Sequence, residues 1–241
     1  ERRVGRGVRD LVLRGVAGVL RTPGRHLRLH LTGGPDDGWR RDHTDRPRGD
    51  PRLPGVGRLT AGTLDTDVLV VGGGPAGSSV ATWLARSGHD VTLVEKRPTP
   101  RHKACGDALT PRALRELTLL GVDPFEFGGH RLAGVRLMYE QREVTAPWPR
   151  HRDLPDHAVS LRRDVLDAQL RRGAADAGAT VLMGHRATAP IVERGFVRGA
   201  SLSIDDDLDA DAPHRDVVRS RFVVVADGAN SSFGRDLGTT R

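Results

Sequence analysis

Two short aliphatic runs flank an amphipathic stretch between residues 65 and 96. The first run covers residues 68–71 and is followed at once by glycines, and the second covers residues 91–94 and ends on an acidic residue. Between them, Val80, Leu84 and Ala85 recur at helical spacing. Because short continuous aliphatic runs are typical of strands buried on both faces, this pattern predicts a strand, a helix and a second, parallel strand.

The pattern after residue 96 predicts two more helices and several strands. Thr110 and Pro111 have the residue types of a helix cap and a first helical residue, and Gly121 marks the end of that helix. A second helix is predicted at about 163–177. Apolar runs predict one or two strands within residues 133–148 and single strands at 180–183, 190–193, 196–204 and 216–226. We therefore expect an α/β fold, Rossmann-like with a parallel sheet, together with part of an antiparallel sheet.

The acidic segment of residues 205–211 lies between the last two predicted strands. A calcium-binding loop of the EF-hand type would need glycine where Ala210 stands and glutamate where Asp216 stands. We therefore expect a solvated hairpin turn. The histidines are scattered without the spacing of zinc ligands, so the sequence predicts no metal site.

Charge separates residues 1–60 from the rest of the chain. These residues hold 14 of the 38 Lys and Arg but only 7 of the 31 Asp and Glu, which leaves 24 basic and 24 acidic residues in the remainder. The neutral remainder argues against a nucleic-acid-binding protein. Residues 1–60 are rich in glycine, proline and arginine and show no sustained period, so we expect a disordered leader or a non-native extension. A basic arm at a membrane surface is the alternative.

The single cysteine, Cys105, excludes an intramolecular disulfide and fits a reducing compartment. No apolar run approaches the roughly 20 residues that a membrane-spanning helix needs. We therefore expect a cytoplasmic protein whose contact with membranes is peripheral at most.

Glycines directly after the first predicted strand have the spacing of a dinucleotide-binding turn. Gly72 allows a tight turn, Gly74 leaves room for a pyrophosphate, and Gly77 lets the helix approach the strand. The helix begins at Pro75 and Ala76, and its N-terminal amides and dipole favour an anion.

An acid follows the second strand of the same unit. Glu95, followed by Lys96, stands where a carboxylate accepts hydrogen bonds from the ribose hydroxyls of an adenosine, and it disfavours a 2′-phosphate. The unit is therefore predicted to bind an adenine dinucleotide.

Two further segments resemble motifs of flavoproteins related to para-hydroxybenzoate hydroxylase. Val225, Ala226, Asp227, Gly228 and Ser231 resemble the strand-to-loop signature A-D-G-x-x-S, whose Asp and Gly lie beside the FAD pyrophosphate and ribose in those proteins. Arg163, Leu166, Asp167 and Leu170 resemble the helix start R-x-x-L-D-x-x-L. The resemblance implies that Arg163 lies near the flavin and that the backbone of Ala187 contacts adenine. A helix-face arginine is the alternative for Arg163.

Residues 103–113, K-A-C-G-D-A-L-T-P-R-A, narrow the resemblance to the geranylgeranyl reductase family. In that family this loop runs under the isoalloxazine ring, which implies that Cys105, Gly106 and Asp107 lie beneath the flavin and that Cys105 lies close to hydride transfer. A buried, small apolar side chain is the alternative for Cys105.

The resemblance implies an FAD-dependent oxidoreductase that reduces C=C bonds of an isoprenoid lipid or a polyprenyl quinone tail. Electrons would come from NAD(P)H or a small redox protein. An FAD-dependent aromatic monooxygenase and a non-catalytic binding module are the alternatives.

The resemblance covers residues 65–241. It implies an FAD-binding domain with part of a substrate domain inserted at about 125–158. The family's third FAD motif does not follow residue 228, so we expect the C-terminal part of the enzyme to be absent from this chain. The first residue is Glu1 rather than Met, which favours a fragment or a misplaced start.

Overall fold

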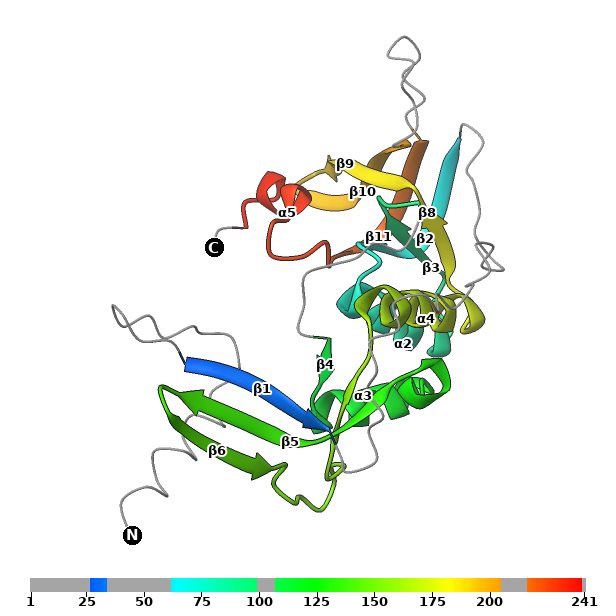
Figure 1. Ribbon diagram of the computed structural model, residues 1–241. Helices are drawn as coiled ribbons and strands as arrows, with labels where there is room; N and C mark the ends of the chain where they lie inside the picture. Colours follow the sequence, from blue (N-terminus) through cyan, green and yellow to red (C-terminus); the bar gives the residue numbers. More distant parts are fainter. Residues whose placement is uncertain (1–26, 34–61, 99–106, 205–215, 240–241) are drawn as a thin grey trace.

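The computed structural model describes residues 27–33, 62–98, 107–204 and 216–239 (Figure 1). The described residues form two sheets, with helices packed between and around them.

The larger sheet has six strands and is mostly parallel. Its strand order is β8 (Thr180–Met183), β3 (Val91–Glu95), β2 (Thr63–Val71), β11 (Asp216–Val225), β10 (Phe196–Ile204) and β9 (His185–Glu193). The first four strands run parallel, whereas β10 and β9 are added antiparallel as a meander. This confirms the parallel βαβ unit predicted from the two aliphatic runs.

The alternation of side chains along β2 divides two hydrophobic cores between the faces of this sheet. Val68 and Val70 face the core made with α2 (Pro75–Arg86) and α4 (Arg163–Asp176). Leu69 and Val71 face the opposite core, which includes residues of β9 and β10 and Phe233 of α5 (Ser232–Asp236). Because β2 is buried on both faces, it forms a continuous aliphatic run rather than an alternating one.

The smaller sheet has five strands, and all of its pairings are antiparallel. It contains β1 (Leu27–Gly33), β5 (His130–Tyr139), β6 (Arg142–Pro147), β7 (Ala158–Ser160) and β4 (Ala108–Leu109). The expected strands within 133–148 are therefore two, joined as a hairpin. Strands β4 and β7 were not predicted, because two or three residues carry no measurable periodicity.

Strand β1 departs from the expectation of a leader without regular structure. It pairs with β5 along its whole length, from Leu27 opposite Tyr139 to Gly33 opposite Leu132. The sequence alternates leucine at 27, 29 and 31 with polar residues, a period-two pattern that the surrounding glycines and prolines conceal. The rest of residues 1–60 lies outside the described residues, as does the expected turn at 205–211.

Helix α3 (Pro111–Leu120) has the ends that its sequence predicts. The Thr110 hydroxyl accepts a hydrogen bond from the Ala113 amide at 3.4 Å, and Gly121 is left-handed with φ 76°. Arg86 of α2 donates to the carbonyls of Leu119 and Leu120 at 3.0 and 2.8 Å. A third hydrophobic core joins α3 to α4 and β7, and α3 lies below α2 and α4 in Figure 1.

Within the described residues, none of the helices combines the length and the apolar character that crossing a membrane requires.

We predict opposite effects on stability from alanine at two glycines. Gly199 lies in a β-bulge of β10 with φ +137°, and a Cβ there would lie 2.0 Å from the Val218 carbonyl oxygen. Gly199→Ala should therefore lower the free energy of unfolding by about 2 kcal/mol or more. Gly173 lies inside α4 with open space around it, so Gly173→Ala should raise that free energy by about 0.5 to 1 kcal/mol. Urea unfolding midpoints measure both effects, and equal midpoints for the two variants would contradict the description of these backbones.

Candidate functional site

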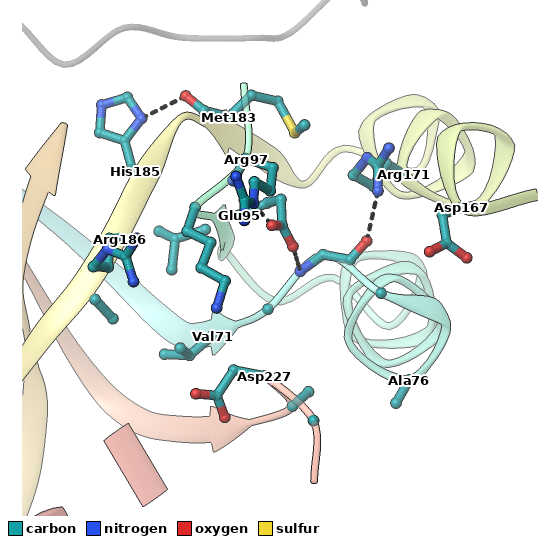
Figure 2. A pocket seen from close by; sticks show the side chains of 18 of the residues that line it. Val71, Ala76, Glu95, Arg97, Asp167, Arg171, Met183, His185, Arg186 and Asp227 are labelled. Carbon is teal, nitrogen blue, oxygen red and sulfur yellow. Dashed lines mark hydrogen bonds between the residues drawn. The ribbon is translucent and has the colours of Figure 1, made fainter. Parts of the chain in front are cut away.

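A cleft opens where the carboxyl ends of β2, β3 and β11 meet the N-terminus of α2 (Figure 2). Ligands of open α/β sheets bind at this edge. The cleft is lined by residues 71–76, 94–97 and 185–187, by Asp167, Arg171, Met183 and Ser232, and by residues 226–228.

The three motif glycines are required for different reasons. Gly72 has φ +106°, and a Cβ on it would lie 2.6 Å from the Ala226 carbonyl oxygen. A Cβ on Gly77 would lie 1.9 Å from the Gly72 carbonyl oxygen, so α2 can approach β2 only with glycine at this position. A Cβ on Gly74 would meet nothing within 4 Å. Packing against the described residues therefore requires Gly72 and Gly77, whereas it does not require glycine at position 74, which lines the cleft.

The N-terminus of α2 faces this space without a side-chain cap. Gly74 is the extended N-cap residue and, being glycine, provides no side-chain cap, and Pro75 occupies the start of the helix. The first amides of a helix have no acceptor within the helix. Together with the helix dipole, they form a site suited to a phosphate group.

Glu95 lies on the opposite side of the glycine turn with both carboxylate oxygens engaged. Oε2 accepts from the Gly73 amide at 2.8 Å, and Oε1 accepts from the Arg97 amide at 3.0 Å. An ionised carboxylate has about four acceptor positions, so the group remains able to accept from two ribose hydroxyls. The backbone bonds fix its orientation at the rim of the cleft.

Asp227 provides a test of whether the cleft fits a polar ligand. Its Oδ1 is buried and has no hydrogen-bond partner among the described residues, although the residue lines the cleft. A buried acceptor without a donor is costly, and a bound hydroxyl or amide would remove that cost. Gly228 follows with φ +95° and open space at its Cβ position, so the chain leaves the cleft without filling it. The residues therefore fit a dinucleotide such as FAD.

Most of the residues expected at the site lie in this cleft. They are Gly72, Gly74, Pro75, Ala76, Glu95, Lys96, Ala187, Asp227 and Gly228, with Gly77 directly behind the turn. Arg163 is not among the lining residues; it forms an ion pair with Asp167 at 3.0 Å, and both side chains are largely buried. Asp107 has φ 50° and its carbonyl accepts from the Leu161 amide at 2.8 Å, next to β4. Cys105 and Gly106 lie outside the described residues.

The sequence interpretation missed Gly73 and Arg171. Arg171 is only 4% exposed, and its Nη1 donates to the Gly73 carbonyl at 2.9 Å. Burial lowers the pKa of the Arg171 guanidinium, while the charges of Glu95 and Asp167 oppose that shift. Arg163, Asp167 and Arg171 are spaced four apart, on one face of α4, and this charged stripe was the available signal.

The family described as FAD binding domain matches residues 65–241. The chain belongs to this family. FAD is therefore the cofactor of this family, and the cleft at the ends of β2, β3 and β11 is the candidate site for it.

Curated relatives and a solved structure place the chain more narrowly. Menaquinone reductase of Mycobacterium tuberculosis is 40% identical over 172 residues, 71% of this chain and 40% of the relative. Digeranylgeranylglycerophospholipid reductase of Methanoculleus marisnigri is 33% identical over 181 residues, 71% of this chain and 41% of the relative. A geranylgeranyl bacteriochlorophyll reductase-like protein of Thermoplasma acidophilum matches with a TM-score of 0.54 and 30% identity, over 73% of this chain and 43% of that chain.

The resemblance to the geranylgeranyl reductase family of FAD-dependent proteins is thereby confirmed. The chain spans about two fifths of the length of the curated relatives it matches.

Substitution at Gly74 should separate cofactor binding from folding. Gly74→Ala adds a methyl group where the chain leaves open space, but alanine is a poorer N-cap residue than glycine, so we expect the free energy of unfolding to fall by no more than about 1 kcal/mol. The same methyl group would obstruct the pyrophosphate, and FAD affinity should fall about tenfold or more. Quenching of FAD fluorescence on titration measures the affinity.

Gly77→Ala is the matched comparison, because its Cβ would overlap the Gly72 carbonyl oxygen. This variant should lose stability first and FAD binding as a consequence. Unaltered FAD binding by a folded Gly74→Ala protein would contradict the placement of the pyrophosphate.

Removing the charge of Glu95 should weaken FAD binding without unfolding the protein. Glu95→Gln keeps one carbonyl oxygen but loses ionised acceptors for the ribose, and hydrogen bonds to charged groups contribute about 1.5 to 3 kcal/mol. The dissociation constant for FAD should therefore rise about tenfold or more. Glu116→Gln, at an exposed side chain of α3, is the control and should leave FAD affinity unchanged. Equal affinities of the two variants would argue against a role for Glu95 in the site.

Proposed function

We propose that this chain is part of an FAD-dependent oxidoreductase that reduces C=C bonds in an isoprenoid lipid or a polyprenyl quinone tail. The proposal depends on two features that occur in the same chain. One is a cleft that fits FAD, and the other is the sequence of residues 103–113, which resembles the geranylgeranyl reductase family. The names of the relatives agree, since one is a menaquinone reductase and another a digeranylgeranylglycerophospholipid reductase.

In this proposal, each part of the cleft holds a different part of FAD. The Gly74 and Ala76 amides at the start of α2 bind the pyrophosphate, Glu95 accepts from the adenosine ribose, and the Ala187 backbone contacts adenine. Asp227 and Gly228 complete the pyrophosphate and ribose site. Arg163 lies toward the flavin, and Cys105, Gly106 and Asp107 lie beneath the ring.

Reduced FAD, when bound, supplies a hydride to one carbon of the alkene, and the other carbon takes a proton from an acid or from water. The protein's contribution is chiefly to hold the apolar tail away from water. Transfer of each five-carbon unit of such a tail from water into an apolar channel contributes about 3 to 4 kcal/mol to the binding free energy, before association costs. An uncharged tail therefore needs no ionic partner. The balanced charge of residues 61–241 agrees with a ligand of this kind.

The partners follow from the same chemistry. The electron donor is NAD(P)H or a small redox protein. Since the sequence shows no second glycine-rich dinucleotide turn, NAD(P)H would bind only transiently. A substrate with a long isoprenoid tail resides in membranes, so we propose a cytoplasmic location with peripheral contact at the membrane surface.

An anaerobic single-turnover experiment tests this function. The full-length protein is reduced under exclusion of oxygen and mixed with a lipid that carries an unsaturated geranylgeranyl tail, and with the same lipid fully saturated as the control. We expect flavin reoxidation with the unsaturated lipid alone, together with a mass gain of two hydrogens in its tail. A menaquinone substrate requires the mass measurement, because its quinone ring could reoxidise the flavin without any change in the tail.

Different results identify the alternatives. Oxygen-dependent consumption of NAD(P)H that a phenol stimulates, with a hydroxylated product, would contradict the reductase and indicate an aromatic monooxygenase. Failure of the protein to retain FAD would indicate a non-catalytic module.

A further inference from the structure

The peptide units on both sides of Gly73 are held from opposite directions by charged side chains. The Gly73 amide donates to Glu95 Oε2 at 2.8 Å, and the Gly73 carbonyl accepts from Arg171 Nη1 at 2.9 Å (Figure 2). The Ser78 hydroxyl of α2 donates to the same carbonyl at the longer distance of 3.3 Å. Glu95 ends β3, whereas Arg171 comes from α4, 98 residues after Gly73. A tertiary contact therefore fixes this part of the turn.

The side chains of Glu95 and Arg171 leave no room for a side chain at position 73. A Cβ at this position would lie 2.9 Å from the Cβ of Glu95 and 3.0 Å from the Cδ of Arg171. The spacing G-x-G-x-x-G does not call for glycine here. The close approach of Glu95 and Arg171 explains it.

The planar trans peptide links the Gly73 carbonyl to the amide of Gly74. The C=O and N–H groups of one trans peptide unit point in opposite directions. When Arg171 holds the Gly73 carbonyl toward α4, the Gly74 N–H is directed away from α4, and Gly74 lines the cleft. We propose that Arg171 is a positioning residue, which orients the Gly74 amide toward the pyrophosphate before the dinucleotide binds.

The cost of burying Arg171 supports a role beyond packing. The side chain is 4% exposed, and its Nε has no hydrogen-bond partner among the described residues. A buried guanidinium with an unpaired donor contributes less to the stability of the fold than a well-packed apolar side chain of similar volume would. Glu95 and Asp167 compensate the charge, and both line the same cleft. A role of Arg171 in ordering the binding site therefore explains its burial better than a role in stabilising the fold.

This inference rests on dinucleotide binding by the cleft and not on the proposed reductase reaction. The test compares Arg171→Met, which keeps the length of the side chain without its donors, with Arg171→Lys, which keeps a donor and the charge. Arg172→Met is the matched control, because Arg172 is the next residue on α4 and its side chain is 57% exposed. Titration calorimetry with FAD, ADP and AMP gives the affinities, and urea unfolding shows whether each variant is folded.

We expect Arg171→Met to lose affinity for FAD and ADP about tenfold or more, with a clearly smaller loss for AMP, which lacks the pyrophosphate. Arg171→Lys should recover part of the loss, and Arg172→Met should bind all three ligands as the unmodified protein does. In ligand-free protein with 15N-labelled glycine, the Gly74 amide resonance should shift in Arg171→Met; the spectrum of Gly74→Ala identifies that resonance. A role in stability alone would move neither the ratio of ADP to AMP affinity nor this resonance selectively.

Equal losses of ADP and AMP affinity in folded Arg171→Met, or an unshifted Gly74 resonance, would overturn the inference. If Arg171→Met does not fold, the same two readouts on Arg171→Lys decide the question, with a weaker ADP preference and a shifted resonance as the expected result. Failure of the unmodified protein to bind FAD would instead contradict the cofactor site itself, and with it the proposed function.

Discussion

The contact between the start of α2 and the end of β2 is the constraint on which the rest of the structure depends. No side chain fits between Gly77 and the Gly72 carbonyl, so the helix begins directly against the strand. The first amides of α2 are thereby carried to the edge where β2, β3 and β11 end. An anion site at this edge follows from the backbone geometry, because the first amides of the helix have no acceptor within it.

Two charged side chains around this turn hold its backbone groups in place. Glu95 fixes the Gly73 amide and Arg171 fixes the neighbouring carbonyl, while Asp227 leaves an acceptor unpaired on the other side of the cleft. Glu95 and Arg171 bind the backbone of the turn, whereas Asp227 Oδ1 has no partner among the described residues. This division matches a site that is ordered in advance and completed by the dinucleotide, which lowers the entropy lost on binding.

Local patterns predicted the elements whose causes are local. The aliphatic runs of β2 and β3, the cap at Thr110 and the left-handed Gly121 all lie within a few residues of the features that they determine. The tight turn at Gly72 and the place of Glu95 at the end of β3 followed from spacing within one βαβ unit, and the roles of Gly74 and Glu95 in binding stay predictions. Strand β1 and the contact between Arg171 and Gly73 could not be predicted in this way, because each depends on a partner about a hundred residues away in the sequence. The sequence of α4 shows its charged stripe, but only the packing of α4 against α2 shows which backbone group that stripe reaches.

A crystal structure of the protein grown with FAD tests the central claim most directly. The account predicts the pyrophosphate at the N-terminus of α2, within hydrogen-bond distance of the Gly74 and Ala76 amides, with a ribose hydroxyl on the Glu95 carboxylate. FAD bound at another place, or a cleft closed by side chains in the presence of saturating FAD, would contradict this account.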